Sequence, residues 1–431
     1  MSIQEQDLLT SPRLQRLRDA LAQKKPRTLT EFWQEVETQG TPLIEPIEGD
    51  QHHYLVTFLW RAVEEKHTVT ISSSLTGSLS GWSSKQHRFA NLLGTDIWYR
   101  SYRVPGDTRT TYQLGLNDPL AANEEEEDTR KQIPLFRVDP LGARTFVLQA
   151  DPEIEDEEEV QSMVELPAAP TQKWSAIHPY AARGKLEMHR LRSNLLENTR
   201  RVWVYTPPGY DPQSIYGVLL LFDGGVYAAT IPTPVILDNL LAAGRIPPLV
   251  AILVCSLNWE DRERELSCYP PFVRFLTDEL LPWVKQRYAI SLHPEQMIVG
   301  GSSYGGLAAA FAGLIRPDIF GNVLAQSGSF YWTPEGDEEF EWITRQYAIA
   351  TNLPRRYYLS VGHFENNPRR SDSGPTQLAA VRHFRDVLHA RGREVHYQEC
   401  NSGHDYCAWY GSLADGIQAL AGRLSQEQDR P

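Results

Sequence analysis

Residues 297–306 constrain this chain more than any other stretch, and they read Met-Ile-Val-Gly-Gly-Ser-Ser-Tyr-Gly-Gly. The three apolar residues predict a strand that leads into the glycines, and the Leu-Ala-Ala-Ala-Phe that follows predicts a helix. A serine at such a turn is typical of a nucleophile elbow, whose strained backbone exposes the hydroxyl. We identify Ser303 as the nucleophile because it, unlike Ser302, has glycine both two residues before and two residues after. A glycine- and serine-rich surface loop is the alternative.

A serine nucleophile needs a base and an acid. His404, in Asn-Ser-Gly-His-Asp, follows the last predicted strand and is the predicted base. Glu365 follows the strand at residues 357–361 and is the predicted acid, with Asp372 as the alternative and a surface ion pair as the plainer interpretation of either. The acid would hold the histidine tautomer and stabilise the imidazolium. The chain order serine, acid, histidine is that of the α/β-hydrolases.

The developing oxyanion needs backbone N–H donors. One donor is predicted at Tyr304, directly after the nucleophile. The other is predicted at Gly224 or Gly225, in Phe-Asp-Gly-Gly-Val after an apolar strand. An ordinary Asp-Gly turn explains the same residues equally well.

Two further loops follow predicted strands at the carboxyl edge of the sheet, where open α/β folds bind ligands. Arg262 and Arg264 follow the strand at residues 250–254 and are predicted to meet an anionic substrate, although a solvated charge cluster is the default. Trp332, with Tyr331, follows the strand at residues 322–326 and is predicted to line the pocket.

Composition restricts the partners and the compartment. A net charge of −13 argues against nucleic acid or an anionic membrane as a partner. No apolar run approaches the length of a membrane span, and the first residues do not resemble a signal peptide. The cysteines lack metal-ligand spacing and are expected to be buried, reduced thiols in a cytoplasmic protein: Cys255, Cys268, Cys400 and Cys407.

The 431 residues suggest two domains. Residues 1–35 look helical, and period-two segments then predict an all-β, immunoglobulin-like sandwich, with strands at 55–60, 68–71, 97–104 and 110–114. Acidic runs at 124–128 and 151–159 are interpreted as solvated loops or linkers. The second run marks the predicted boundary, which gives a first domain at 1–165 and a catalytic domain at 166–431.

The second part of the chain alternates apolar strands with helices. This pattern predicts a mostly parallel, doubly wound sheet of the α/β-hydrolase class. Strands are expected at 187–192, 200–206, 218–222, 250–254, 297–300, 322–326, 357–361 and 394–399. Helices are expected at 235–241, 272–288, 307–315, 376–390 and 413–424.

Taken in order, the motifs resemble the enterochelin (ferric enterobactin) esterase family over nearly the whole chain. In the first domain the resemblance rests on Thr30-Glu-Phe-Trp, Val56-Thr-Phe-Leu-Trp-Arg, Asp139-Pro-Leu and Val164-Glu-Leu-Pro-Ala-Ala-Pro. In the second it rests on Arg200-Arg-Val-Trp-Val-Tyr, Leu221-Phe-Asp-Gly-Gly, Arg264-Glu-Leu, Gly301-Ser-Ser-Tyr-Gly-Gly-Leu, Gln326-Ser-Gly-Ser with Trp332, Gly362-His-Phe-Glu and Gly403-His-Asp. This linear order is more specific than any single motif.

The resemblance implies a β-sandwich domain followed by an esterase-type hydrolase, with Ser303 as nucleophile, His404 as base and Glu365 as acid. It implies a cytoplasmic substrate, the ferric complex of a cyclic tri-serine tricatecholate siderophore, opened at its ester bonds. Iron then enters as part of the substrate, so no cofactor and no metal site are expected. This substrate is anionic, so basic residues must offset the charge of the protein, and Arg61 and Arg103 are further candidates.

Two other functions fit parts of the sequence. A feruloyl or acetyl-sugar esterase shares the fold, but such enzymes are normally exported. A non-catalytic siderophore-binding protein would not need the complete set of serine, acid and histidine.

Overall fold

The computed structural model describes residues 11–62, 68–76, 87–116, 135–154, 156–366 and 374–422. The packing of the backbone divides the chain into two compact units. The first comprises Met1–Leu148, Glu159–Pro170 and Asn401–Cys407, and the second comprises Gln149–Glu158, Thr171–Cys400 and Ala408–Pro431. A single boundary after residue 165 stays a prediction, because the two units alternate along the chain.

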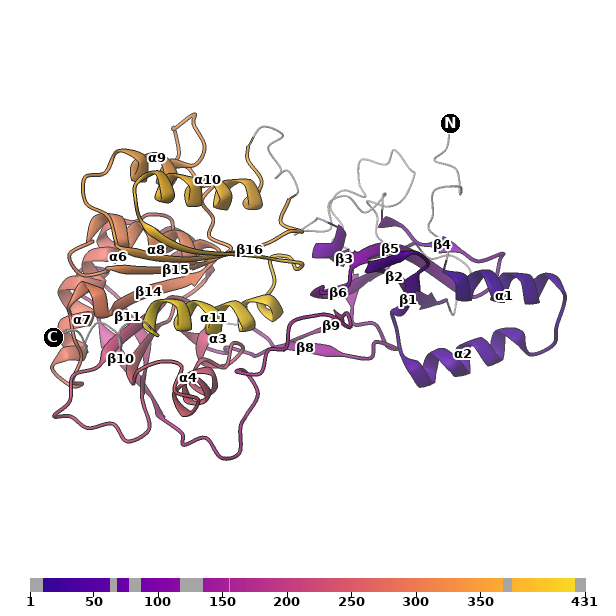
Figure 1. The fold of residues 1–431 in the computed structure, drawn as a ribbon, viewed down its shortest axis with the longest axis horizontal. Helices are drawn as coiled ribbons and strands as arrows, with labels where there is room; N and C mark the ends of the chain where they lie inside the picture. The colour runs from indigo at the N-terminus through magenta and orange to yellow at the C-terminus, as the bar shows by residue number, and fades with distance from the viewer. Residues whose placement is uncertain are drawn as a thin grey trace. The chain divides into compact units, whose positions relative to one another are not determined.

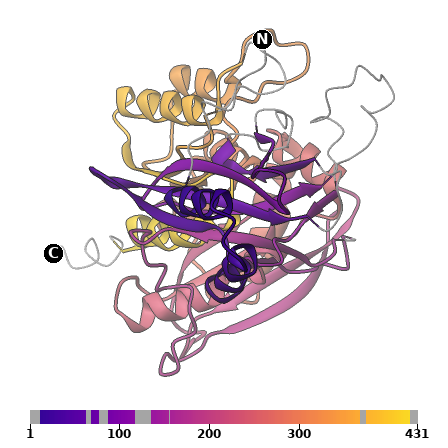
Figure 2. The same ribbon diagram turned by 90° about the vertical axis from the view of Figure 1, so that its right-hand side faces the viewer.

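The first unit opens with two helices, α1 (Pro12–Ala22) and α2 (Thr28–Gln39). Ser11 begins α1 by accepting a hydrogen bond from the Leu14 N–H at 3.1 Å, as N-cap serines do. The apolar sides of both helices pack with strand residues such as Leu59 and Ile97 in one core cluster. The prediction of N-terminal helices is confirmed for the described residues, and the indigo helices are seen end-on in Figure 2.

Two antiparallel sheets complete the described part of this unit. One has the order β1-β2-β5-β4, and the other β3-β6-β9-β8 with β7 paired to β6. Val56 and Phe58 of the first sheet share a core with Ile71 and Leu114 of the second, so the sheets form the predicted sandwich. The strands are β1 (Leu43–Ile47), β2 (Asp50–Arg61), β3 (Val69–Ser73), β4 (Ala90–Asn91), β5 (Ile97–Pro105), β6 (Arg109–Leu116), β7 (Leu135–Arg137), β8 (Thr145–Leu148) and β9 (Glu159–Glu165), and a short 3₁₀ turn, η2 (Ser74–Thr76), follows β3.

An eight-stranded sheet organises the second unit, with the order β10-β11-β13-β12-β14-β15-β16-β17. The pairs β10–β11 and β11–β13 are antiparallel and all the others are parallel. All residues of β13, β14, β15 and β16 are buried, as expected for strands covered on both faces. The strands are β10 (Lys185–Arg192), β11 (Thr199–Thr206), β12 (Gly217–Leu221), β13 (Leu249–Val254), β14 (Met297–Ser302), β15 (Asn322–Gln326), β16 (Arg356–Gly362) and β17 (Glu394–Cys400).

Helices cover both faces of this sheet (Figure 1). A Cβ on Gly306 of α8 would contact Ala325, whereas one on Gly416 of α11 would contact Leu324, the preceding residue of β15. Neighbouring strand residues point to opposite faces, so α8 and α11 lie on opposite sides and the sheet is doubly wound, as predicted. The helices are α3 (Gly224–Ala228), α4 (Thr233–Ala242), α5 (Trp259–Leu266), α6 (Pro270–Arg274), α7 (Leu281–Lys285), α8 (Tyr304–Ile315), α9 (Trp342–Ile349), α10 (Gln377–Ala390) and α11 (Tyr406–Ala421), with a π-helical segment, η6 (Phe275–Leu280), joining α6 to α7 and a 3₁₀ turn, η7 (Pro294–Gln296), before β14.

Most described residues of the second acidic run are exposed, as predicted for a solvated loop, but two of its carboxylates pair with arginines of the sheet. The Arg201 guanidinium donates to both Asp151 carboxylate oxygens at 2.8 and 2.6 Å, and Arg190 donates to Glu153. These two arginines of the sheet offset the repulsion between the carboxylates. The first acidic run, 124–128, lies outside the described residues.

Helix α10 and strand β17 are joined by the Glu399 carboxylate, which suggests a test of stability against pH. Hydrogen bonds from the Arg382 guanidinium, at 2.8 and 2.7 Å, lower the pKa of Glu399 from 4.5 to about 2, with a smaller contribution from the Tyr397 hydroxyl. A depressed carboxyl pKa contributes stability above the unfolded value of 4.5 that is lost as the pH falls through about 2.

We therefore expect Glu399→Gln to lower the free energy of unfolding at pH 7 by about 1–2 kcal/mol, after allowing for solvent screening. The difference in Tm between wild type and variant should shrink between pH 4.5 and pH 2. Glu394→Gln, which alters an ion pair with His396 on the same strand, is the control. A Tm difference independent of pH would contradict the prediction.

Candidate active site

Ser303 stands at the turn between β14 and α8 with φ 56° and ψ −119°. Positive φ is strained for a residue with a side chain and persists only where the surroundings enforce it. Here the Ser303 N–H donates to the Gln326 carbonyl at 2.9 Å, and the Ser303 carbonyl accepts from the Leu307 N–H at 3.2 Å. The backbone thus has the strand, strained serine and helix that a nucleophile elbow requires.

Gly301 makes this turn possible. A Cβ at this position would lie 2.8 Å from the Gly305 carbonyl carbon, closer than real side chains approach. The first turn of α8 therefore runs directly against the end of β14. Any side chain on Gly301 would move the helix away and release the strain at Ser303.

Two serines after β15 link the nucleophile to the predicted acid. The Ser329 hydroxyl lies 3.4 Å from that of Ser303, and the Ser329 N–H donates to the Ser303 carbonyl at 3.0 Å. Ser327, with φ 47°, donates its hydroxyl to Glu365 Oε1 at 2.7 Å. Because both serines belong to one short segment, the position of Glu365 is coupled to that of Ser303.

Glu365 is buried, at 3% exposed, in the loop after β16. Its Oε1 also accepts the Gly362 N–H at 2.7 Å, and the Trp409 indole N–H donates to Ser327 Oγ at 3.1 Å. A buried carboxylate needs such donors, since an unpaired charge in a protein interior is costly. The carboxylate is thereby held in one orientation, as expected of a triad acid. The alternative, Asp372, lies outside the described residues.

Sequence analysis did not assign a role to Ser327 and Ser329. The only signal in the sequence is the motif Gln326-Ser-Gly-Ser at the end of a predicted strand. The hydrogen bond to Glu365 depends on the positive φ of Ser327, which no pattern in the sequence predicts.

His404 follows β17 and lies half-buried in the segment Asn401–Cys407, which belongs to the first unit. Ser303 and Glu365 belong to the second unit. The role of His404 as base stays a prediction. The carboxyl ends of β14, β16 and β17, from which the three residues extend, lie on the same edge of the parallel sheet.

The predicted oxyanion loop runs beside the elbow. The Phe222 N–H donates to the Gly300 carbonyl at 3.1 Å, and a Cβ on Gly305 would lie 3.4 Å from Asp223 Oδ2. Gly224 and Gly225 then begin α3. This places their backbone near the first residues of α8, which begins at Tyr304. That the N–H groups of Tyr304, Gly224 and Gly225 stabilise an oxyanion stays a prediction.

Arg262 contacts the same loop. Its Nε and Nη2 donate to the two Asp223 carboxylate oxygens at 2.7 and 2.8 Å, and the pair is largely buried. Its helix, α5, is fixed to β11 by the fully buried ion pair between Glu265 and Arg200 at 2.6 and 2.8 Å. These pairs fix the position of Asp223 at φ 53°.

The other predicted binding residues have more exposed surroundings. Arg264 pairs with Asp261 at the surface of α5. Trp332 is half-buried and meets Trp342 edge to face, with ring centroids 6.0 Å apart. In the first unit, Arg61 pairs with Asp96, and Arg103 pairs with Asp50. The roles of all four in substrate binding stay predictions.

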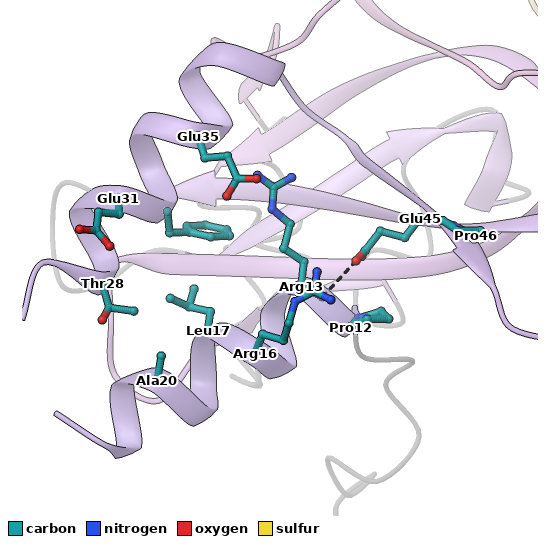
Figure 3. Close-up of a pocket in the computed structure, with 11 residues that line it drawn as sticks. Pro12, Arg13, Arg16, Leu17, Ala20, Thr28, Glu31, Glu35, Glu45 and Pro46 are labelled. Carbon is teal, nitrogen blue, oxygen red and sulfur yellow. Dashed lines mark hydrogen bonds and ion pairs between the residues drawn. The ribbon is translucent and has the colours of Figure 1, made fainter. Parts of the chain in front are cut away.

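A hollow of about 730 Å³ lies between α1, α2 and β1 of the first unit. Figure 3 shows Arg13 at its centre, between Glu35 and Glu45. The residues that line it include none of the predicted catalytic or binding residues. Among all the described residues, the hollow included, no group of three or more His, Cys, Asp or Glu side chains is arranged to hold a metal ion.

Two family models match the chain. The enterochelin esterase N-terminal model matches residues 55–175, and the esterase model matches residues 193–420, more than half of the chain. The iron(III) enterobactin esterase of Dickeya dadantii is 30% identical, and the match covers 90% of this chain and 92% of that protein. The chain belongs to the enterochelin esterase family.

Other members and solved structures agree in sequence and fold. The iron(III) salmochelin esterase of Escherichia coli is 26% identical over 94% of this chain and 97% of its own length. The enterobactin esterase of Shigella flexneri, solved in the presence of enterobactin, has a TM-score of 0.71 at 25% identity and covers 91% of this chain and 98% of its own. The ferric enterobactin esterase of Salmonella typhimurium has a TM-score of 0.71 at 27% identity, with 92% and 100% covered.

The buried position of Glu365 predicts which acid this enterochelin esterase uses. We expect Glu365→Gln to lower kcat about a thousandfold or more, because an amide cannot stabilise an imidazolium as a carboxylate does. Asp372→Asn, the matched control, should leave kcat within about twofold of wild type. Steady-state hydrolysis of an aryl ester, with Tm as a folding check, measures both. A large loss in Asp372→Asn with little change in Glu365→Gln would reverse the assignment.

Proposed function

We propose that this enterochelin esterase is a serine esterase that hydrolyses the lactone ester bonds of a ferric catecholate siderophore. The observation that carries the proposal is the strained Ser303 elbow within a chain that matches its relatives along nearly their whole length. Those relatives are named as iron(III) enterobactin and salmochelin esterases. Hydrolysis opens the macrocycle and weakens its hold on Fe(III).

The reaction follows from the roles assigned to the residues. His404 takes the proton from the Ser303 hydroxyl as its oxygen attacks a lactone carbonyl. The N–H groups of Tyr304 and of Gly224 or Gly225 donate to the oxyanion. When the tetrahedral intermediate collapses, the alkoxide of a serine of the siderophore leaves and takes a proton from His404, while Ser303 stays acylated. Water, deprotonated by His404, then attacks the acyl-enzyme and releases a carboxylic acid and free Ser303.

Glu365 completes the mechanism by holding His404 in the tautomer that can accept the Ser303 proton. The Ser327 hydroxyl and the Gly362 N–H both donate to its Oε1 and so hold the buried carboxylate in one orientation. Its charge stabilises the imidazolium that forms in both halves of the reaction.

We place the reaction in the cytoplasm, where reduced thiols are the rule. Support comes from the four cysteines, none of which is joined in a disulfide.

The direct test incubates the purified protein with ferric and iron-free trilactone siderophore and follows linear products and serine-ester monomers by chromatography. Wild type should convert the trilactone, and Ser303→Ala should abolish conversion while retaining the same Tm. Feruloyl and acetyl-sugar esters are the comparison substrates. Faster turnover of those esters, or no turnover of any ester, would contradict the proposal.

Replacing the two arginines of α5 should have different kinetic effects on a charged and on a neutral substrate. Arg264→Ala should raise KM for the ferric tricatecholate several-fold and leave a neutral aryl ester unaffected. Arg262→Ala should lower kcat for both substrates, because it leaves the largely buried Asp223 carboxylate unpaired beside the oxyanion loop. Steady-state kinetics with both substrates measures this. Equal effects of Arg264→Ala on the two substrates would remove Arg264 from the binding site.

A further inference from the structure

We propose that strand β6 of the all-β unit positions the catalytic histidine, through hydrogen bonds from Thr110 and Thr111 to Asp405. This inference rests on the proposed function, in which His404 is the base. It makes Thr110, Thr111 and Asp405 positioning residues, which act through the loop that carries His404.

Asp405 carries the main contact. It is 6% exposed, and its Oδ2 accepts the Thr111 N–H at 2.6 Å, the Thr111 hydroxyl at 2.9 Å and the Thr110 hydroxyl at 3.1 Å. Its Oδ1 accepts the Cys407 N–H at 3.1 Å, in the first turn of α11. Charge-assisted hydrogen bonds of this kind are roughly twice as strong as neutral ones, so one carboxylate fixes the loop that carries His404 to strand β6.

Two more contacts hold the same loop before the histidine. The Asn401 side-chain amide donates to Asp107 Oδ1 at 2.7 Å, and the Arg109 N–H donates to the Asn401 carbonyl at 3.3 Å. A Cβ on Gly403 would overlap the Ser74 side chain, so the loop backbone passes directly against η2. The residues on both sides of His404 are therefore fixed by the first unit: Gly403 packs against η2, and Asp405 is bonded to β6.

This arrangement matters because a general base works only when its nitrogen is within hydrogen-bond reach of the nucleophile. A histidine on a loop without such anchors would sample many orientations, and a displacement of about 1 Å can cost about a hundredfold in rate. In the proposed function Glu365 sets the tautomer of the histidine, whereas the β6 threonines fix the backbone of the loop that carries it. The two roles are distinct and can be tested separately.

The test uses the full chain and the double variant Thr110→Val/Thr111→Val, which keeps the β-branched shape but removes both hydroxyl donors. We expect kcat for a neutral aryl ester to fall about 10- to 100-fold with KM nearly unchanged. The rate at which an aryl phosphonate labels Ser303 should fall in parallel. Thr110→Ser/Thr111→Ser, which restores the hydroxyls, should return kcat to within about threefold of wild type.

Tyr112→Phe is the matched control, because Tyr112 is the next residue of β6 and donates to a different buried carboxylate, Asp139, at 2.9 Å. It should lower Tm without lowering kcat or the labelling rate. The inference is overturned if the valine variant loses no more kcat than Tyr112→Phe, or if the serine variant fails to restore it. If wild type itself neither turns over esters nor reacts with the phosphonate at Ser303, it is the proposed function that fails.

Discussion

The rest of the site depends on the strained backbone of Ser303. Its positive φ survives because β14 and α8 cross at Gly301 without room for a side chain, and because the backbone of β15 bonds to the serine on one side. The Ser329 N–H then donates to the Ser303 carbonyl, and the Phe222 N–H donates to the carbonyl of Gly300, just before the elbow. A change that relaxes this crossing would displace the nucleophile, its neighbour Ser329 and the oxyanion loop together.

Buried ion pairs fix the loops that surround this turn. Arg200 and Glu265 hold α5 against the sheet, and Arg262 of that helix holds Asp223. Such pairs contribute little net stability, since desolvation offsets their attraction, but breaking one leaves an uncompensated buried charge. Their effect is to hold the loop of Asp223, Gly224 and Gly225 in one conformation. Asp405 acts in the same way on the histidine loop, with hydroxyl and amide donors in place of an arginine.

The strands and helices could be predicted because their patterns are local. The period-two segments became β2, β3, β5 and β6, and the continuous apolar runs became the buried strands β12 to β16. The acidic run at 151–159 is mostly exposed, as its charge predicts, but its pairing with Arg201 and Arg190 follows from the fold and from no local pattern. Ser327 was overlooked for a related reason, since its hydroxyl reaches Glu365 only through a positive φ.

The elbow and the family could be predicted from the amino-acid sequence alone, and the order of Ser303, Glu365 and His404 along the chain is the basis for the predicted roles of these residues. Glycine spacing and alternating strands and helices are enough for this, because the physics behind them acts within about ten residues. The partners of the charged and polar side chains depend instead on the folded arrangement, which pairs Asp223 with Arg262, Glu365 with Ser327, and Asp405 with Thr110 and Thr111. These pairs join residues far apart in the chain, and their formation depends on which loops the folded sheet brings within hydrogen-bond distance.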